Sequence, residues 1–188
     1  MKAIISAFDF KKAMSIVRPC VGKPDDRPLL SFIAGRARDN KAVLTACDGY
    51  RLAEYAIEAF QIDFEEGCFW INPKVRTFFA GPQLTIETDE KNTTITDGQF
   101  GYSFRNWEGK QLDTDKLFAE GCGDIKNISF NPSLLASTVK PLAIDRQNAV
   151  VLHVGDWNRG VVLTMPKEPG YRGMILPMRV SGEWEVTP

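Results

Sequence analysis

The chain has 188 residues, of which 44% are hydrophobic and 11% aromatic, so it can bury a core and is not a disordered chain. Its formal net charge of −1 argues against tight nucleic-acid binding, which usually requires a basic excess, but leaves room for weak contact through one basic face. Every apolar run is shorter than the ~18 residues of a membrane helix, and residues 1–6 lack the apolar core of a signal peptide.

The cysteines indicate the compartment. Cys20, Cys47, Cys68 and Cys122 lie far apart and form no Cys-x-x-Cys pair. This spacing is typical of reduced thiols rather than of a disulfide framework or a zinc site. We therefore expect a cytoplasmic protein that holds no metal or cofactor and does not associate with a membrane.

Taken in order, the predicted elements repeat with a period of about 60 residues. Three times a short apolar strand ends at a residue that can cap a helix, and these caps, Asp9, Asn72 and Asn131, are 63 and 59 residues apart. Their side chains can accept hydrogen bonds from the free N–H groups of a first helical turn. Pro73 and Pro132 suit the first helical position, so a helix of two to three turns should follow each cap.

Three strands should follow each helix, because apolar and polar residues alternate between turn residues. Their predicted ranges are 29–37, 41–47 and 51–58 in the first unit, 83–88, 92–97 and 101–105 in the second, and 149–154, 160–165 and 174–180 in the third. The sequence thus predicts an α+β fold of three βαβββ units, with helices on one face of antiparallel sheets.

The units suggest a division of the chain. Two units make a domain of residues 1–118, and the small, Gly-rich stretch 119–124 is a plausible linker. The third unit, 125–180, stands alone as a half domain. The tail 181–188 follows it and has no assigned role.

Two stretches of sequence are the most informative. In Leu-Thr-Ala-Cys-Asp-Gly-Tyr-Arg-Leu-Ala, residues 44–53, Asp48-Gly49 predicts a tight turn between two strands. This hairpin resembles the Ala-Thr-Asp-Gly-(His/Tyr)-Arg-Leu-Ala hairpin of the bacterial DNA polymerase III beta subunit, the sliding clamp, with Cys47 in place of the usual Thr. Met-Ile-Leu-Pro-Met-Arg-Val, residues 174–180, resembles that family's C-terminal Val-Val-Met-Pro-Met-Arg-Leu.

The resemblance implies a peptide-binding cleft. In the sliding clamps these two stretches meet and grip short motifs of polymerases and other partners. The implied lining residues here are Leu30, Cys47, Gly49, Tyr50, Arg51, Leu52, Met174, Leu176, Pro177 and Met178. Methionine adapts to varied partners, each buried Leu or Phe anchor would contribute ~1.5–3 kcal/mol, and Arg51 could hold a peptide backbone or carboxylate. The alternative is that Leu30, Leu52 and Leu176 are ordinary core residues.

The resemblance also implies weak contact with double-stranded DNA. Clamp helices line a DNA channel, and the outward stripes of the predicted helices lack acidic residues past their caps. Their basic residues are Lys11, Lys12, Arg18, Lys74, Arg76 and Lys140. Contacts of this kind are sequence-independent and salt-sensitive. The alternative is an ordinary solvated helix face.

The sequence offers little for catalysis, because its one histidine, His153, lies within an apolar strand and no nucleotide-binding or nucleophile motif is present. The resemblance implies a non-catalytic, clamp-like protein that binds replication or repair factors and could serve as a DNA polymerase processivity factor. A family chain carries six units, and the resemblance covers the middle domain and the second half of the last.

Two rival interpretations remain open. One is a monomeric adaptor or decoy that binds clamp-binding peptides without encircling DNA, in contrast to a homo-oligomeric ring of four chains. The other is an unrelated repeat protein whose motif matches are accidental. A different fold, or a Leu176 far from Leu52, would establish the latter.

Overall fold

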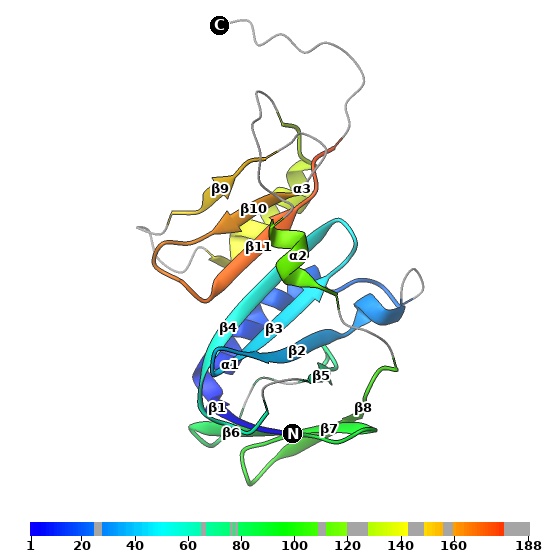
Figure 1. The fold of residues 1–188 in the computed structure, drawn as a ribbon, viewed down its shortest axis with the longest axis vertical. Coiled ribbons are helices and arrows are strands. Elements are labelled where there is room, and N and C mark those ends of the chain that lie inside the picture. Colours follow the sequence, from blue (N-terminus) through cyan, green and yellow to red (C-terminus); the bar gives the residue numbers. More distant parts are fainter. Residues whose placement is uncertain are drawn as a thin grey trace, which may run out of the picture.

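The computed structural model describes residues 1–24, 28–64, 67–75, 77, 79–108, 112–119, 128–142, 149–155 and 160–178. Their eleven strands form one network of hydrogen-bonded antiparallel pairs, and the helices pack against its faces (Figure 1). In this part of the chain, no helix is both long and apolar enough to cross a membrane.

The first two units are joined by strands that pair across the boundary between them. β1 (Lys2–Ser6) pairs with the end of β4 (Arg51–Ile62) in its own unit and, along its other edge, with β6 (Gln83–Thr88). From β6 the sheet continues through β7 (Asn92–Thr96) to β8 (Gly101–Arg105). In turn, β5 (Cys68–Ile71) pairs with the first unit. Neither unit can bury its apolar face alone, so this pairing gives both a shared core.

The third unit joins the first through one long strand. β2 (Ile33–Arg38), β3 (Lys41–Cys47) and β4 (Arg51–Ile62) form the first unit's meander. The start of β4 also pairs with β11 (Tyr171–Ile175), whereas its end pairs with β1.

β11 is followed outward by β10 (Val161–Thr164) and β9 (Val151–His153). The start of β4 therefore joins the first unit to the third, and it lies beside the end of β11, the last strand among the described residues.

One core lies on the helical side of β3 and β4. α1 (Ala7–Val17) turns Phe10, Met14 and Val17 into it, at the spacing of one helical stripe. α3 (Pro132–Val139) lies on the same side, next to the short 3₁₀ turns Arg18–Cys20 and Lys140–Leu142. The core extends without a break from Phe10 to Ile175, so it holds the first and third units together.

The helix caps were predicted with mixed success. Asn131 caps α3 as predicted, because its side chain accepts from the backbone N–H groups of Ser133 and Leu134. At α1 the prediction of Asp9 is wrong: the helix begins at Ala7, and Ser6 is the cap, accepting from the Asp9 N–H.

The prediction of a helix after Asn72 is also wrong for the described residues. Asn72 closes a single turn, in which its carbonyl accepts from the Val75 N–H and its side chain from the Lys74 N–H. None of the described residues between Asn72 and β6 is helical, and Pro82 directly precedes that strand. The predicted strand ahead of Asn131 is absent too, since residues 128–131 are irregular.

Most strands lie where the alternation placed them. Residues 41–47, 83–88 and 101–105 are strands with the predicted bounds. Residues 28–31 instead form a 3₁₀ turn, so β2 starts only at Ile33. β11 runs from Tyr171 to Ile175 rather than from 174 to 180, and the strand stops two residues before Pro177. α2 (Thr114–Ala119) was not predicted at all.

Candidate functional site

The hairpin of residues 41–62 has the tight turn that its sequence predicts. Gly49 has φ +87°, which is the conformation that a type II′ turn requires at its first central position. The Asp48 carboxylate closes the turn by accepting from the backbone N–H groups of Tyr50 and Arg51, both at 3.0 Å. The turn fixes the register of β3 against β4, so that Cys47 lies opposite Leu52.

The two informative stretches are neighbours in the structure. Met174 of β11 lies directly opposite Leu52 of β4, and the Leu176 N–H donates to the Tyr50 carbonyl at 2.9 Å. This pairing joins residues that are more than 120 positions apart in the sequence. Leu176 is therefore close to Leu52, so the separation that would have established the unrelated-repeat interpretation is not found.

Alternation along β4 divides these residues between two faces. Leu52 and Glu54 point to one face, which we call the outer face, while Ala53, Tyr55 and Ile57 point to the core beneath α1. On the outer face, Leu52, Met174 and Val162 form a small buried cluster with Cys47 against it. α2 crosses in front of this face in Figure 1, and its Phe118 completes the cluster.

A hollow adjoins this cluster on the outer face. It contains two of the predicted cleft residues, Leu30 and Cys47, and one wall is formed by the start of α2. Its lining residues are Leu29, Leu30, Phe32, Ala34, Arg36, Thr45, Cys47, Trp70, Leu112 and Thr114. Seven of these ten are apolar or thiol side chains, so the hollow suits an apolar ligand group.

Three of the predicted residues, which we call the rim residues, have exposed apolar side chains. Tyr50 is 65% exposed, and Leu176 and Met178 are also exposed, although all three are large and apolar. Pro177 lies half-buried between the last two, and Gly49 forms the turn beside Tyr50. The hydrogen bond from Leu176 to Tyr50 places these two exposed residues side by side, whereas the Met178 N–H donates to the Ser129 carbonyl ahead of α3, and none of the three lines the hollow.

Arg51 does not line this site. It points away from Leu52, to the helical side of the sheet, where each guanidinium nitrogen has a partner. Nε donates to the Asp48 carboxylate at 2.8 Å, and the other two donate to the Ser137 hydroxyl of α3 and to the Pro19 carbonyl. The role suggested for it at a peptide is therefore not what the structure shows; Arg51 ties β4 to both helical segments.

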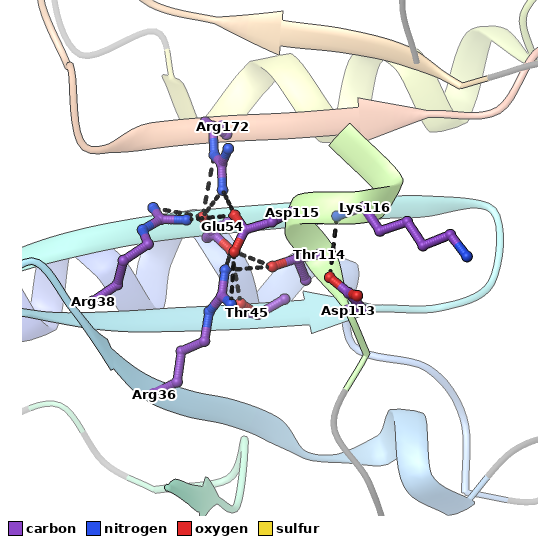
Figure 2. Close-up of polar contacts among 9 residues, drawn as sticks. All are labelled: Arg36, Arg38, Thr45, Glu54, Asp113, Thr114, Asp115, Lys116 and Arg172. Atoms are coloured by element: carbon purple, nitrogen blue, oxygen red, sulfur yellow. Dashed lines mark hydrogen bonds and ion pairs between the residues drawn. The ribbon is translucent and has the colours of Figure 1, made fainter. Parts of the chain in front are cut away.

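A charged network that the sequence did not predict lies beside the cluster (Figure 2). The Glu54 side chain is only 1% exposed, and it accepts from Arg172 at 2.6 Å and from the Thr114 hydroxyl at 2.8 Å. Arg38 lies 2.9 Å from the same carboxylate, and Arg36 lies 3.4 Å from it. Burial alone would raise the pKa of Glu54, but the Arg172 hydrogen bond and the arginine charges bring it below its usual value.

Asp115 of α2 is the second carboxylate of this network. It lies 2.9 Å from each of Arg36, Arg38 and Arg172. The hydrogen bond from Arg36 is the main reason that the pKa of Asp115 falls to about 2. Unlike Glu54, Asp115 is 52% exposed, so the two carboxylates sit at the bottom and the top of the arginine cluster.

The basic residues predicted for DNA contact are only partly free. Lys11, Lys74 and Lys140 are exposed. Lys12 is ion-paired with Glu168 at 2.6 Å, and Arg18 donates to the Val75 carbonyl at 2.9 Å. Arg76 lies outside the described residues. The basic stripe is therefore weaker than the sequence suggested, because Glu168 comes from a distant loop that no helix periodicity reveals.

The structure gives His153 no catalytic neighbours among the residues it describes. The imidazole is exposed on β9, with Nε2 2.8 Å from the Thr164 hydroxyl. Within the described ranges, no group of three His, Cys, Asp or Glu side chains could hold a metal ion.

The fold has close counterparts among solved structures. No model of a known protein family matches the chain, and no curated protein matches it. The DNA polymerase III beta subunit of Thermotoga maritima matches with a TM-score of 0.80 at 14% identity, over 96% of this chain and 66% of that one.

Two further structures agree with that match. The sliding clamp of Bacillus subtilis gives 0.77 at 14% identity and the Streptococcus pneumoniae beta chain 0.77 at 15%, both over 96% of this chain. This chain spans 64% and 65% of their lengths. The predicted α+β, clamp-like fold is thus confirmed, and identities this low show the fold alone.

Proposed function

We propose that this chain is a non-catalytic, clamp-type binding protein, whose outer face holds a short apolar segment of a DNA polymerase or another replication or repair factor. The observation that carries the proposal is the pairing of Leu52 with Met174 beside the hollow lined by Leu30 and Cys47. Two sequence stretches with no local relation converge on one apolar cluster, and the exposed side chains of Tyr50 and Leu176 belong to the same two stretches.

The chemistry of the surface selects the ligand. The Leu, Phe, Trp and Cys side chains of the hollow leave room for about one water molecule, so a Leu or Phe anchor would enter as these side chains move apart. Each anchor would then gain ~1.5–3 kcal/mol from burial. The rim residue Met178 is flexible and polarizable, which suits partners of varied shape. Cys47 is a weaker hydrogen-bonding group than the hydroxyl it replaces in the resembling motif, so apolar contacts should dominate the affinity.

The solved structures support this class of function. They are named as beta subunits of DNA polymerase III and as sliding clamps, and their fold extends over 96% of this chain. A cytoplasmic protein that acts by binding, without a reaction of its own, is consistent with those names.

A second function, weak contact with double-stranded DNA, has its own support. α1 and α3 lie on the same side of the sheet, because Arg51 reaches both the Ser137 hydroxyl and the turn that follows α1. Lys11 on α1 and Lys140 at the end of α3 are both exposed.

Light scattering distinguishes a homo-oligomeric ring on DNA from the monomeric adaptor or decoy that binds peptides only.

Titration with a labelled Gln-Leu-x-Leu-Phe peptide, followed by fluorescence anisotropy, tests the principal proposal. We expect saturable binding to the wild-type chain and its loss in Leu52→Glu and Met174→Glu, because each places a charge in the apolar cluster. Met178→Glu changes one of the exposed rim residues and should weaken binding while leaving the fold intact.

The matched control is Phe100→Glu. It makes the same kind of change at an exposed residue in the turn between β7 and β8, so its affinity should equal that of the wild type. Absence of wild-type binding at several hundred micromolar peptide would contradict the proposal, as would full affinity in all three site variants.

A further inference from the structure

α2 is a six-residue helix that its side chains hold on the outer face. Asp115 binds the arginine cluster, Phe118 enters the apolar cluster, and the Thr114 hydroxyl donates to Glu54. Isolated helices this short are unstable in water, because the cost of nucleation is not recovered in so few residues. The helical form of α2 therefore depends on its docking, which makes α2 a bound segment as much as a part of the scaffold.

The site under α2 has a fixed half and an exchangeable half. Arg36 and Arg38 come from β2 and Arg172 from β11, and all three surround Glu54. Glu54 is buried in the sheet and cannot leave, but one carboxylate does not balance three guanidinium groups. Asp115 supplies the second carboxylate from the solvent side (Figure 2). Without α2 the cluster would carry two uncompensated positive charges, which is a carboxylate-binding site.

An aromatic position lies next to the carboxylate position. Phe118 is 6% exposed and packs among Leu52, Val162 and Met174. The Arg172 guanidinium lies 4.3 Å from the centre of its ring, so one arginine contacts both the Asp115 carboxylate and the aromatic ring. Residues three apart lie on the same face of a helix, and Asp115 and Phe118 have that spacing.

We propose that the surface beneath α2 is a docking site that α2 occupies in the free chain, and that it takes a partner segment with a carboxylate and an aromatic ring one helical turn apart. Charge complementarity and the Asp-x-x-Phe spacing of the resident segment define this partner. The inference deepens the proposed function, because Leu52 and Met174 belong to both surfaces, but its probe and its variants are separate.

The proposal predicts the sign of a mutational effect. A resident segment competes with an added one, at an effective concentration in the ~mM range for a short tether. Weakening the resident segment should therefore strengthen the binding of an added one. If α2 were only a permanent wall of the site, weakening it would leave binding unchanged or reduce it.

The experiment uses a labelled synthetic peptide with the sequence of residues 112–119. Its affinity is measured by anisotropy for the wild-type chain and for Asp115→Asn, which keeps the size of an exposed side chain while removing its charge. We expect at least ~10-fold tighter binding by Asp115→Asn, since a loss of ~1.4 kcal/mol from the resident segment has that effect. Phe118→Ala in the protein should act in the same direction.

Asp113→Asn is the matched control. Asp113 is the neighbouring acid at the start of α2, where its carboxylate accepts from the Lys116 N–H (Figure 2). Asn caps a helix as well as Asp does, so this variant should bind the peptide as the wild type does. The same peptide carrying Asp115→Asn or Phe118→Ala should lose its affinity for the Asp115→Asn protein.

Three outcomes would overturn the proposal. Equal or weaker peptide binding by Asp115→Asn would make α2 a fixed wall. Undiminished binding of the substituted peptides would remove the carboxylate and aromatic specificity. Self-association of the wild-type chain that Phe118→Ala abolishes would make a second copy the occupant. None of these depends on the Gln-Leu-x-Leu-Phe titration, so the peptide cleft and the site under α2 can fail independently.

Discussion

The two faces of β4 have different surroundings, although the residues that form them alternate along one strand. On the helical face, Ala53, Tyr55 and Ile57 join a continuous apolar core with α1 and the third unit. On the outer face, Leu52 and Glu54 are covered by one short helix, a small apolar cluster and three arginines. The helical face holds the fold together, whereas the outer face offers exposed apolar and charged groups for recognition.

The sharpest way to separate the two faces is to damage the helical one. Phe10 is fully buried beneath α1, so Phe10→Ala should reduce the free energy of unfolding by ~3–5 kcal/mol. Peptide affinity per folded molecule should not change, because Phe10 contacts only the helical side. Urea unfolding and anisotropy on the same sample check both statements; a folded variant with lost peptide affinity would show that the faces are coupled.

Glu54→Gln removes the buried negative charge beneath the three arginines of the outer face. It leaves three arginines facing a single carboxylate, and we expect a loss of ~2–3 kcal/mol in the free energy of unfolding. Denaturant titration measures this change. A loss under half a kilocalorie would mean that water and Asp115 compensate the arginines without Glu54, and that the buried carboxylate is dispensable.

Acid should weaken the ion pairs that Asp115 makes with the three arginines of the same network. The pKa of Asp115 is about 2 in the folded chain, below the ~3.9 of an ordinary Asp, so its contribution to stability is complete above about pH 4. That contribution is lost as the pH falls from about 4 towards 2. Asp97, whose pKa is also about 2 because of the backbone N–H groups of Phe100 and Gln99, acts in the same window.

The comparison of variants isolates Asp115. Between pH 5 and 2, the melting temperature of Asp115→Asn should fall less than that of the wild type, whereas Asp113→Asn should follow the wild type. Parallel curves for all three proteins would show that the ion pairs of Asp115 do not contribute to stability.

The smallest effect is expected on the weak DNA binding that we propose for the helical face. Lys11→Glu combined with Lys74→Glu should weaken DNA association and lower its dependence on salt by about two counterions. The change should leave peptide affinity intact. Filter binding at several salt concentrations measures it, and a wild-type chain that shows no salt-dependent binding would leave the helical face with a structural role only.

The helical face was the more predictable one, because local patterns determine it. Alternation placed β3 and β6 with correct bounds, and the stripe of Phe10, Met14 and Val17 placed α1. The helix predicted after Asn72 shows the limit of such patterns: the cap and Pro73 start a single turn, but the described residues that follow it are not helical.

The outer face was only half predictable. The two resembling stretches identified Leu52 and Met174, but the arginine cluster joins Arg36 and Arg172, which lie on strands from different units. No local pattern connects them, and α2 is too short to show a periodicity that would reveal Phe118. The misplacement of Arg51 was avoidable, because strand alternation puts it on the face opposite Leu52.

Methionine methyl NMR tests the central claim most directly, since the five methionines sample both faces. Met174 and Met178 lie at the proposed cleft, while Met14 and Met165 belong to the core on the helical side. On addition of the Gln-Leu-x-Leu-Phe peptide, we expect the methyl signals of Met174 and Met178 to shift and those of Met14 and Met165 to stay. Shifts confined to Met14 and Met165, or none at saturating peptide, would contradict the assignment of recognition to the outer face.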